Sequence, residues 1–162
     1  MEKKVNNQIL AVIRVRGPTM IAAKINDTMK MLRLYKVNNC IVIPNQPNYI
    51  GMIKLVKDYI TWGEIDVDTF KILLEKKGRL AGNKPLTKDY LNSKLKTTIE
   101  EFSNGYFEMK KTFKDIPGFK TFFRLNPPLK GFESGGIKKP YSMGGALGYR
   151  KDHINELIRR MI

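Results

Sequence analysis

Cations and aromatic rings alternate through the last third of the sequence, in a pattern that suits a polyanionic ligand. The cations of this segment are Lys120, Arg124, Lys130, Lys138, Lys139, Arg150 and Lys151. The rings interleaved with them are Phe119, Phe122, Phe123, Phe132, Tyr141 and Tyr149. Lysine and arginine neutralise phosphates and release counterions, while aromatic and guanidinium planes stack on unpaired bases. The residue types therefore predict binding to nucleic acid.

The same segment lacks the period of a helix or a strand. Four of the eight prolines and seven of the thirteen glycines fall between Pro117 and Gly148. Pro127-Pro128 stiffens an extended chain, and glycine lets backbone approach a ribose-phosphate surface closely. We therefore expect an irregular arm over about residues 117–152. For any one phenylalanine, packing over a hydrophobic core is the simpler interpretation, but that interpretation does not account for the cations.

The net charge of +15 and the pI of about 9.9 point to the same class of partner. The excess is concentrated at the two ends of the chain. Residues 1–65 carry 10 Lys/Arg against 4 Asp/Glu, residues 66–109 carry 8 against 7, and residues 110–162 carry 12 against 4. No run of about 18 apolar residues and no signal-peptide pattern is present, so we expect a cytoplasmic protein without a membrane partner.

Residues with catalytic potential are few. His153 is the only histidine, and its place at the start of an expected terminal helix favours a solvated side chain. Cys40, the single cysteine, lies in the apolar run CIVI and is expected in the core. The sequence contains no HExxH, GKS/GKT or CxxC motif. We therefore expect no enzyme, no metal, no cofactor and no small-molecule substrate.

One catalytic alternative involves residues 16–19 (RGPT). Small βαβ phosphatases hold phosphate on backbone N–H groups between a strand and a helix, so a phosphate-handling hydrolase stays open. Pro18 removes one of the needed donors, however. Arg14 and Arg16 are better explained as cations at a strand end that reach an external phosphate.

Apolar patterning predicts a compact α+β core over residues 1–65. β-branched runs predict strands at 9–15, 40–43 and 59–65. Helical spacing predicts a helix that starts at Pro18 and extends to Leu32, and a second one capped by Asn48. The order strand-helix-strand-helix-strand is typical of helices packed on one face of a sheet.

Residues 66–162 are predicted to form an extension of this core. Asp66 or Asp68 can cap a helix over about 66–77, and Thr87 can cap another over about 87–103. The irregular arm follows, and a short helix from His153 ends the chain.

Several stretches together give the sequence its resemblance to a known family. They are 9–17 (ILAVIRVRG), 39–44 (NCIVIP), 59–64 (YITWGE), 76–80 (KKGRL), 123–132 (FRLNPPLKGF) and 144–148 (GGALG). In this order, the chain resembles archaeal and eukaryotic members of the large-subunit ribosomal protein L30/L7 family. The resemblance implies a β-α-β-α-β core related to the ferredoxin-like fold, with a three-stranded antiparallel sheet and the first strand central.

The resemblance also implies a function. It implies a structural constituent of the large ribosomal subunit in the cytoplasm, whose partners are its ribosomal RNA and neighbouring ribosomal proteins. A free RNA-binding regulator outside the ribosome is the other non-catalytic alternative. RNA contact is implied for Arg14, Arg16, Phe123, Arg124, Leu125, Pro127, Pro128, Lys130 and Gly131. Asn126 joins them because its amide can donate to phosphate or ribose oxygens, and the pattern of cations adds Lys120, Lys138, Lys139, Arg150 and Lys151.

Overall fold

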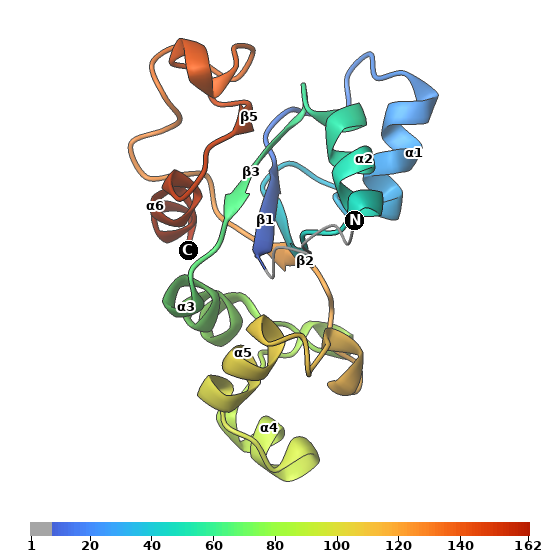
Figure 1. The fold of residues 1–162 in the computed structure, drawn as a ribbon, viewed down its shortest axis with the longest axis vertical. Coiled ribbons are helices and arrows are strands. Elements are labelled where there is room, and N and C mark those ends of the chain that lie inside the picture. Colours follow the sequence, from blue (N-terminus) through green and yellow to red (C-terminus); the bar gives the residue numbers. More distant parts are fainter. Residues whose placement is uncertain (1–7) are drawn as a thin grey trace, which may run out of the picture.

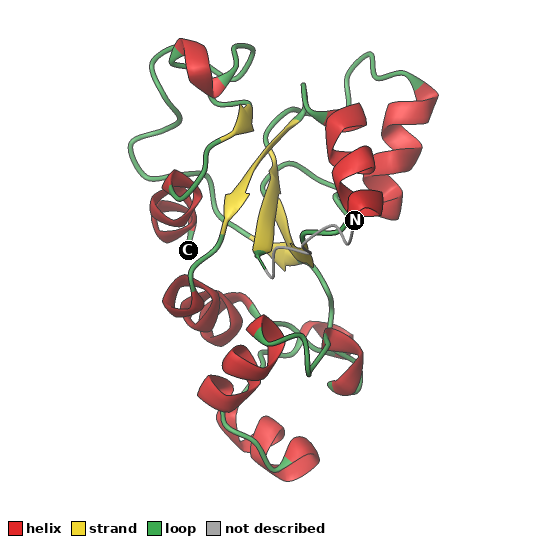
Figure 2. Ribbon diagram, viewed as in Figure 1, coloured by secondary structure: helices red, strands yellow, loops and turns green. Residues whose placement is uncertain are grey.

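The structure is a computed structural model, and it describes residues 8–162. The strands are β1 (Ile9–Arg14), β2 (Asn39–Pro44), β3 (Ile60–Glu64), β4 (Phe123–Arg124) and β5 (Gly148–Tyr149). The helices are α1 (Ala23–Met31), α2 (Pro47–Val56), α3 (Val67–Lys77), α4 (Lys88–Leu95), α5 (Ile99–Phe107) and α6 (His153–Met161). Figure 1 shows their arrangement, and Figure 2 shows the strands lying between two groups of helices.

The sheet has five strands in the order β4-β2-β1-β3-β5, so the prediction of a three-stranded antiparallel sheet is wrong in its detail. The predicted part is present, because β1 is central and antiparallel to both β2 and β3. The extension adds one strand to each edge. β4 is antiparallel to β2, whereas β5 is parallel to β3. Two-residue strands carry no readable alternation, which explains why the sequence did not predict them.

One face of the sheet is covered by α1 and α2. Leu10 and Val12 of β1 point to this side and pack with Met29, Ile53 and the other members of a buried cluster. The alternation of residues along β1 sends its other side chains to the opposite face. This half of the core is supplied entirely by the expected core region, apart from the partly buried Phe122.

The opposite face is covered by the extension. Ile9, Ala11 and Ile13 of β1 share a buried cluster with residues of α3, α5, α6 and the segment before β4. Within it, the hydroxyl of Tyr106 donates to the Val42 carbonyl oxygen at 3.0 Å. Figure 1 shows α6 on the side of the sheet away from α1 and α2, with α3 and α5 below. The two parts of the chain thus share one hydrophobic core.

Helix boundaries differ from the predictions at three places. α1 begins at Ala23 rather than Pro18, because Met20 adopts a left-handed backbone (φ 53°) that a helix cannot contain. α2 begins at Pro47, which suits a first helical position, so Asn48 is not its cap.

The third difference lies in the extension. The single helix expected over 87–103 is two helices, because Lys96 is left-handed (φ 51°) and Thr98 starts a new helix. Thr98 and Glu101 form a reciprocal capping box, whose T-x-x-E signature is visible in the sequence. The predicted Thr87 cap is confirmed, since its hydroxyl accepts from the Tyr90 N–H at 3.3 Å.

The arm follows the surface of α6 and returns to the sheet. The Asn126 N–H donates to the Met161 carbonyl, and the Leu129 N–H to that of Arg160. At the far end of the arm Gly145 is required, because a side chain there would collide with the Lys139 carbonyl oxygen. No helix within residues 8–162 has the length and apolar content to cross a bilayer.

Candidate nucleic-acid interface

Arg14 lies inside the protein, with only 2% of its surface exposed. Its Nη1 donates to the carbonyl oxygens of Leu34 and Tyr35 at 2.8 and 3.0 Å, and its Nε donates to the Arg16 carbonyl. Burial lowers the pKa of the Arg14 guanidinium from its ordinary value. The expectation that Arg14 reaches an external phosphate is therefore corrected: its guanidinium holds the loop after α1.

Arg150 is also buried, and four of the five N–H groups of its guanidinium donate hydrogen bonds within the protein. It donates to both carboxylate oxygens of Glu133, to the Thr61 hydroxyl at 2.7 Å and to the Ala146 carbonyl at 2.9 Å. Its Cζ lies 4.7 Å from the centroid of the Tyr141 ring. The expectation of an RNA contact by this guanidinium is corrected, because a desolvated and paired cation faces inward.

Three apolar candidates of the arm are covered as well. Phe123 is fully buried in an aromatic cluster, with edge contacts to Phe113 and Phe119. Leu125 belongs to the same core, and Pro128 is buried. For Phe123 and Leu125 the packing alternative holds, because their side chains complete the face of the sheet that the extension covers.

The remaining candidates of the arm face solvent. The exposed ones are Arg124, Asn126, Pro127, Lys130, Gly131, Lys138, Lys139 and Lys151, while Lys120 is partly buried. The Asn126 amide donates to the Ile162 carbonyl at 3.2 Å, so part of its donor capacity ties the arm to the C-terminus. The structure therefore divides the residues predicted to contact RNA: some are buried and anchor the arm, and the others are exposed on its surface.

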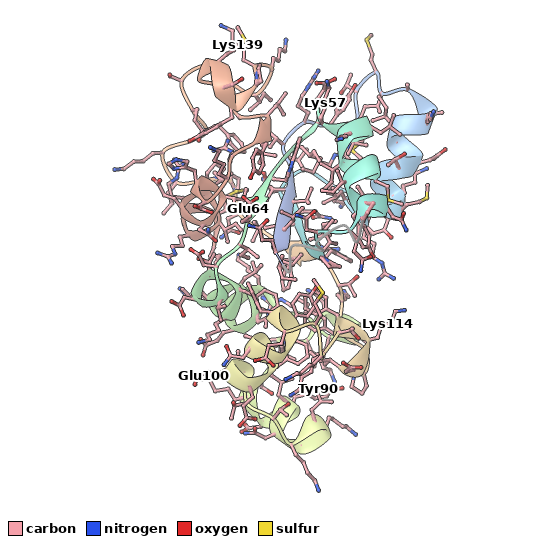
Figure 3. The ribbon with its side chains drawn as sticks, viewed as in Figure 1. Lys57, Glu64, Tyr90, Glu100, Lys114 and Lys139 are labelled. Carbon is pink, nitrogen blue, oxygen red and sulfur yellow. The ribbon has the colours of Figure 1, made fainter. Side chains whose placement is uncertain are left out.

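Lys139 of the arm lies at the same end of the molecule as the turn between α2 and β3, whereas Lys120 lies beside Arg79, to whose carbonyl oxygen its N–H donates. Figure 3 shows Lys57 in that turn and Lys139 in the arm at one end, and Glu100 at the other. Arg16 lies beside the same turn, with its Cζ 4.9 Å from the Tyr59 ring centroid and its Nη1 3.2 Å from the Asp58 carbonyl oxygen. Its guanidinium is half-buried and still open to solvent on one side.

The loop of residues 16–19 does not have the geometry of a phosphate-binding loop. α1 begins at Ala23, so this loop does not enter the first turn of a helix. Pro18 and Thr19 are exposed in a turn instead. Without helix N–H groups that converge on one point, the loop offers no anion cradle, and the hydrolase alternative loses its structural basis.

His153 and Cys40 are the other residues that the sequence offered for catalysis. His153 is exposed at the first residue of α6, and Cys40 is buried, which raises the pKa of its thiol to about 12. Within the part of the chain that the structure describes, no group of three or more His, Cys, Asp or Glu could hold a metal ion.

Tyr35, which the sequence did not single out, forms an aromatic pair with Phe122. Tyr35 is exposed, whereas Phe122 is partly buried. Their ring centroids are 5.8 Å apart at an interplanar angle of 80°. Arg124 lies over the Phe122 ring, with its Cζ 5.9 Å from the ring centroid. The available signal was the position of Tyr35 between two cations, Arg33 and Lys36. The pairing with Phe122 depends on β4 and could not be predicted without it.

The sheet, its helical cover and the anchored basic arm define an α+β protein whose solvent-facing functional groups are cations and aromatic rings. The sequence profile of the family described as Ribosomal protein L30p/L7e matches residues 10–60. The chain is 48% identical over 149 residues to a protein of Methanopyrus kandleri, covering 91% of this chain and 100% of the relative. It is 49% identical over 152 residues to one of Methanococcus maripaludis, covering 94% and 98%.

A third relative, from Archaeoglobus fulgidus, is 46% identical over 154 residues, which cover 94% of this chain and 99% of the relative. All three relatives carry the name large ribosomal subunit protein uL30. The similarity extends through the extension as well as the profile-matched core. The chain belongs to the ribosomal protein L30p/L7e family, which confirms the resemblance found in the sequence.

Proposed function

We propose that this chain is a structural, non-catalytic constituent of the large ribosomal subunit in the cytoplasm, where it binds and stabilises large-subunit ribosomal RNA. The observation that carries the proposal is the identity of 46–49% over nearly the whole length of proteins named large ribosomal subunit protein uL30. The net charge of +15 supports a polyanionic partner.

The proposed contact surface consists of the solvent-facing candidates. They are Arg16, Lys120, Arg124, Asn126, Pro127, Lys130, Gly131, Lys138, Lys139 and Lys151. Phosphate contacts position a protein without reading sequence, and A-form RNA is recognised mostly through its shape, phosphates and 2′-hydroxyls. A surface of separate cations on a stiff arm suits this kind of contact, and it requires no cofactor.

We propose a division of labour between residues 1–65 and residues 66–162. The first part supplies the central strands and one covered face, and the extension covers the other face and presents the arm. Because the arm is already packed onto α6 and β3 before it binds RNA, less conformational entropy is lost on binding. Neighbouring ribosomal proteins are proposed partners of the surfaces that RNA leaves uncovered.

Sedimentation of a cell extract that contains the tagged full-length chain tests this function. We expect the chain in the large-subunit fraction at near-stoichiometric amount, at a salt concentration that preserves ribosomes. A chain found mainly among free proteins or small ribonucleoproteins would contradict the proposal and favour a regulator outside the ribosome. Incubation of the purified chain with an acyl phosphate should give no hydrolysis above the uncatalysed rate.

A further inference from the structure

We propose that Tyr35, Phe122 and Arg124 form a stacking site for an unpaired RNA base. This inference rests on the proposed function, and it adds a contact that differs in kind from the phosphate contacts of the arm. The three residues come from two distant parts of the chain. They meet because β4 pairs with β2, with Arg124 opposite Asn39.

Tyr35 is exposed, whereas Phe122 is partly buried beneath the site. Tyr35 is 51% exposed although it contacts Phe122 edge to face at 5.8 Å. A tyrosine that exposes this much aromatic surface gains by covering it, and a base is a planar partner of suitable size.

Hydrogen bonds from the core hold the loop that carries Tyr35. The buried Arg14 guanidinium donates to the carbonyl oxygens of Leu34 and Tyr35 at 2.8 and 3.0 Å. Arg33 and Asn38, which flank the loop, both adopt left-handed backbones (φ 58° and 64°). The left-handed Arg33 ends α1, and the Leu34 N–H donates to the Met29 carbonyl oxygen, so the loop leaves the helix in a defined direction. The ring is thus positioned in advance.

The segments that supply the site carry cations and lack carboxylates. Neither residues 28–57 nor residues 116–132, which supply the site and its surroundings, contain an aspartate or a glutamate. Arg33 and Lys36 are exposed beside Tyr35, and Arg124 is exposed beside Phe122. A base brings its phosphates within reach of these cations, whereas an apolar side chain of a protein partner would not use them. The combination favours RNA over protein.

The test compares two RNA probes with the full-length chain. The probes are a single-stranded oligo(A) of about 12 nucleotides and an RNA duplex of the same length, and affinity is measured by fluorescence anisotropy. We expect Tyr35→Ala to weaken binding of the single strand about ten-fold and binding of the duplex less than about two-fold, because only the single strand offers unstacked bases. Tyr35→Phe should retain the wild-type affinity, since the ring is kept.

Two further variants complete the design. Phe122→Leu keeps apolar bulk but removes a ring, and it should show the same selective loss. Tyr149→Ala is the matched control: Tyr149 is 47% exposed, but its hydroxyl donates to the Glu64 carboxylate at 2.5 Å, and a carboxylate repels phosphate. We expect this control to bind both probes like the wild type.

The alternative outcomes are distinct. If the Tyr35→Ala variant keeps the wild-type affinity, or loses affinity equally for both probes, the stacking site is overturned. The phosphate contacts of the arm would not be affected by that result. The Tyr35→Ala variant could also keep its affinity for both probes and yet be lost from the large-subunit fraction. That result would overturn the stacking site and assign this surface to a protein contact. A wild-type chain that binds neither probe would overturn this site, while the proposed function is decided separately by sedimentation of the full-length chain.

Discussion

Both terminal nitrogens of the Arg150 guanidinium donate hydrogen bonds to the carboxylate of Glu133, and Nη2 lies 2.7 Å from Oε2. The Arg150 side chain is 1% exposed and that of Glu133 is 23% exposed. Arg160 reaches the same carboxylate at 3.6 Å. The pair thus joins the middle of the arm to its end, and it explains how a segment rich in proline and glycine keeps one conformation.

Replacing Arg150 tests this role. Arg150→Lys keeps the charge but cannot reproduce the planar fork or the bonds to Thr61 and Ala146. We expect the free energy of unfolding to fall by about 2 to 3 kcal/mol, because buried donors and acceptors are left unpaired. Urea denaturation followed by circular dichroism measures it. Lys139→Ala, at an exposed position of the same arm, is the control and should change stability by less than about 0.5 kcal/mol. Equal stability of the two variants would contradict the anchoring role.

The pair also predicts a pH dependence of stability. Burial by itself raises the pKa of Glu133, but hydrogen bonds from Arg150 and the charges of Arg150 and Arg160 lower it, and the net pKa lies below the ordinary 4.5. A carboxyl whose folded pKa is depressed contributes stability above its unfolded pKa and loses that contribution as pH falls through the folded pKa.

We therefore expect the free energy of unfolding to decrease as pH falls below about 4.5, with part of this decrease due to Glu133. Glu133→Gln removes the titrating group, so the variant should be less stable at pH 7 and lose less stability between pH 5 and 3. Urea titrations at a series of pH values give both slopes. Parallel slopes for wild type and variant would show that other carboxyls account for the dependence.

Arg124 and Phe123 are neighbours with opposite predicted roles. Arg124 is exposed, and we expect Arg124→Ala to weaken binding of large-subunit RNA by about 1 to 3 kcal/mol with little change in melting temperature. Arg124→Lys should recover part of the loss, because the charge returns without the fork.

Phe123 is fully buried, so Phe123→Ala is the counterpart. We expect it to lower the free energy of unfolding by about 3 to 5 kcal/mol, as for other large aromatic truncations in a core. Melting temperature and RNA affinity are measured on the same variants, with affinity determined below the melting transition. Lost stability with intact affinity for Arg124→Ala would exclude its RNA contact.

Salt gives a test of the whole surface. With a net charge of +15, affinity for large-subunit RNA should fall steeply as salt rises, with a log–log slope of several units set by the number of phosphates contacted. Filter binding between about 50 and 200 mM KCl covers the useful range. Each exposed cation replaced by alanine should reduce the slope by about one unit, and a slope near zero would exclude the electrostatic mechanism.

The division at residue 65 predicts the behaviour of a fragment. Residues 1–65 retain the core on the side of α1 and α2, but Ile9, Ala11 and Ile13 lose the cover of the extension. We expect the fragment to fold with marginal stability, since domains of this size bury only about 60% of their unfolded surface. It should also associate, because an apolar face is open.

Circular dichroism and sedimentation velocity of this fragment, compared with the full chain, provide the measurement. A fragment that remains random coil would show that the extension is needed for folding. A fragment as stable as the full chain would show that the shared core contributes little.

Periodic patterns in the sequence determined most of the framework. β-branched runs located β1, β2 and β3, and apolar spacing located the helices between them, because both signals depend on residues close in the chain. The family resemblance rested on stretches that extend to Gly148, and the comparisons confirmed it. The excess of basic residues and the absence of these catalytic motifs can likewise be read directly from the sequence.

Tertiary structure decided which candidate side chains face solvent. Arg14 and Arg124 are both arginines next to β-branched or aromatic neighbours, yet one is 2% exposed and the other faces solvent. The difference arises because the carbonyls that surround Arg14 belong to the loop after α1, about twenty residues away.

The same holds for Phe122 and Phe123, which are adjacent in the chain and lie on opposite sides of the sheet. Phe123 fills the core of the extension, and Phe122 contacts Tyr35. The local sequence shows that successive side chains alternate between the two faces of the sheet. It does not show what covers each face, because that depends on the packing of α3, α5 and α6 against one of them. Charge and periodicity are local quantities that a sequence shows directly, whereas burial is set by contacts between residues far apart in the chain.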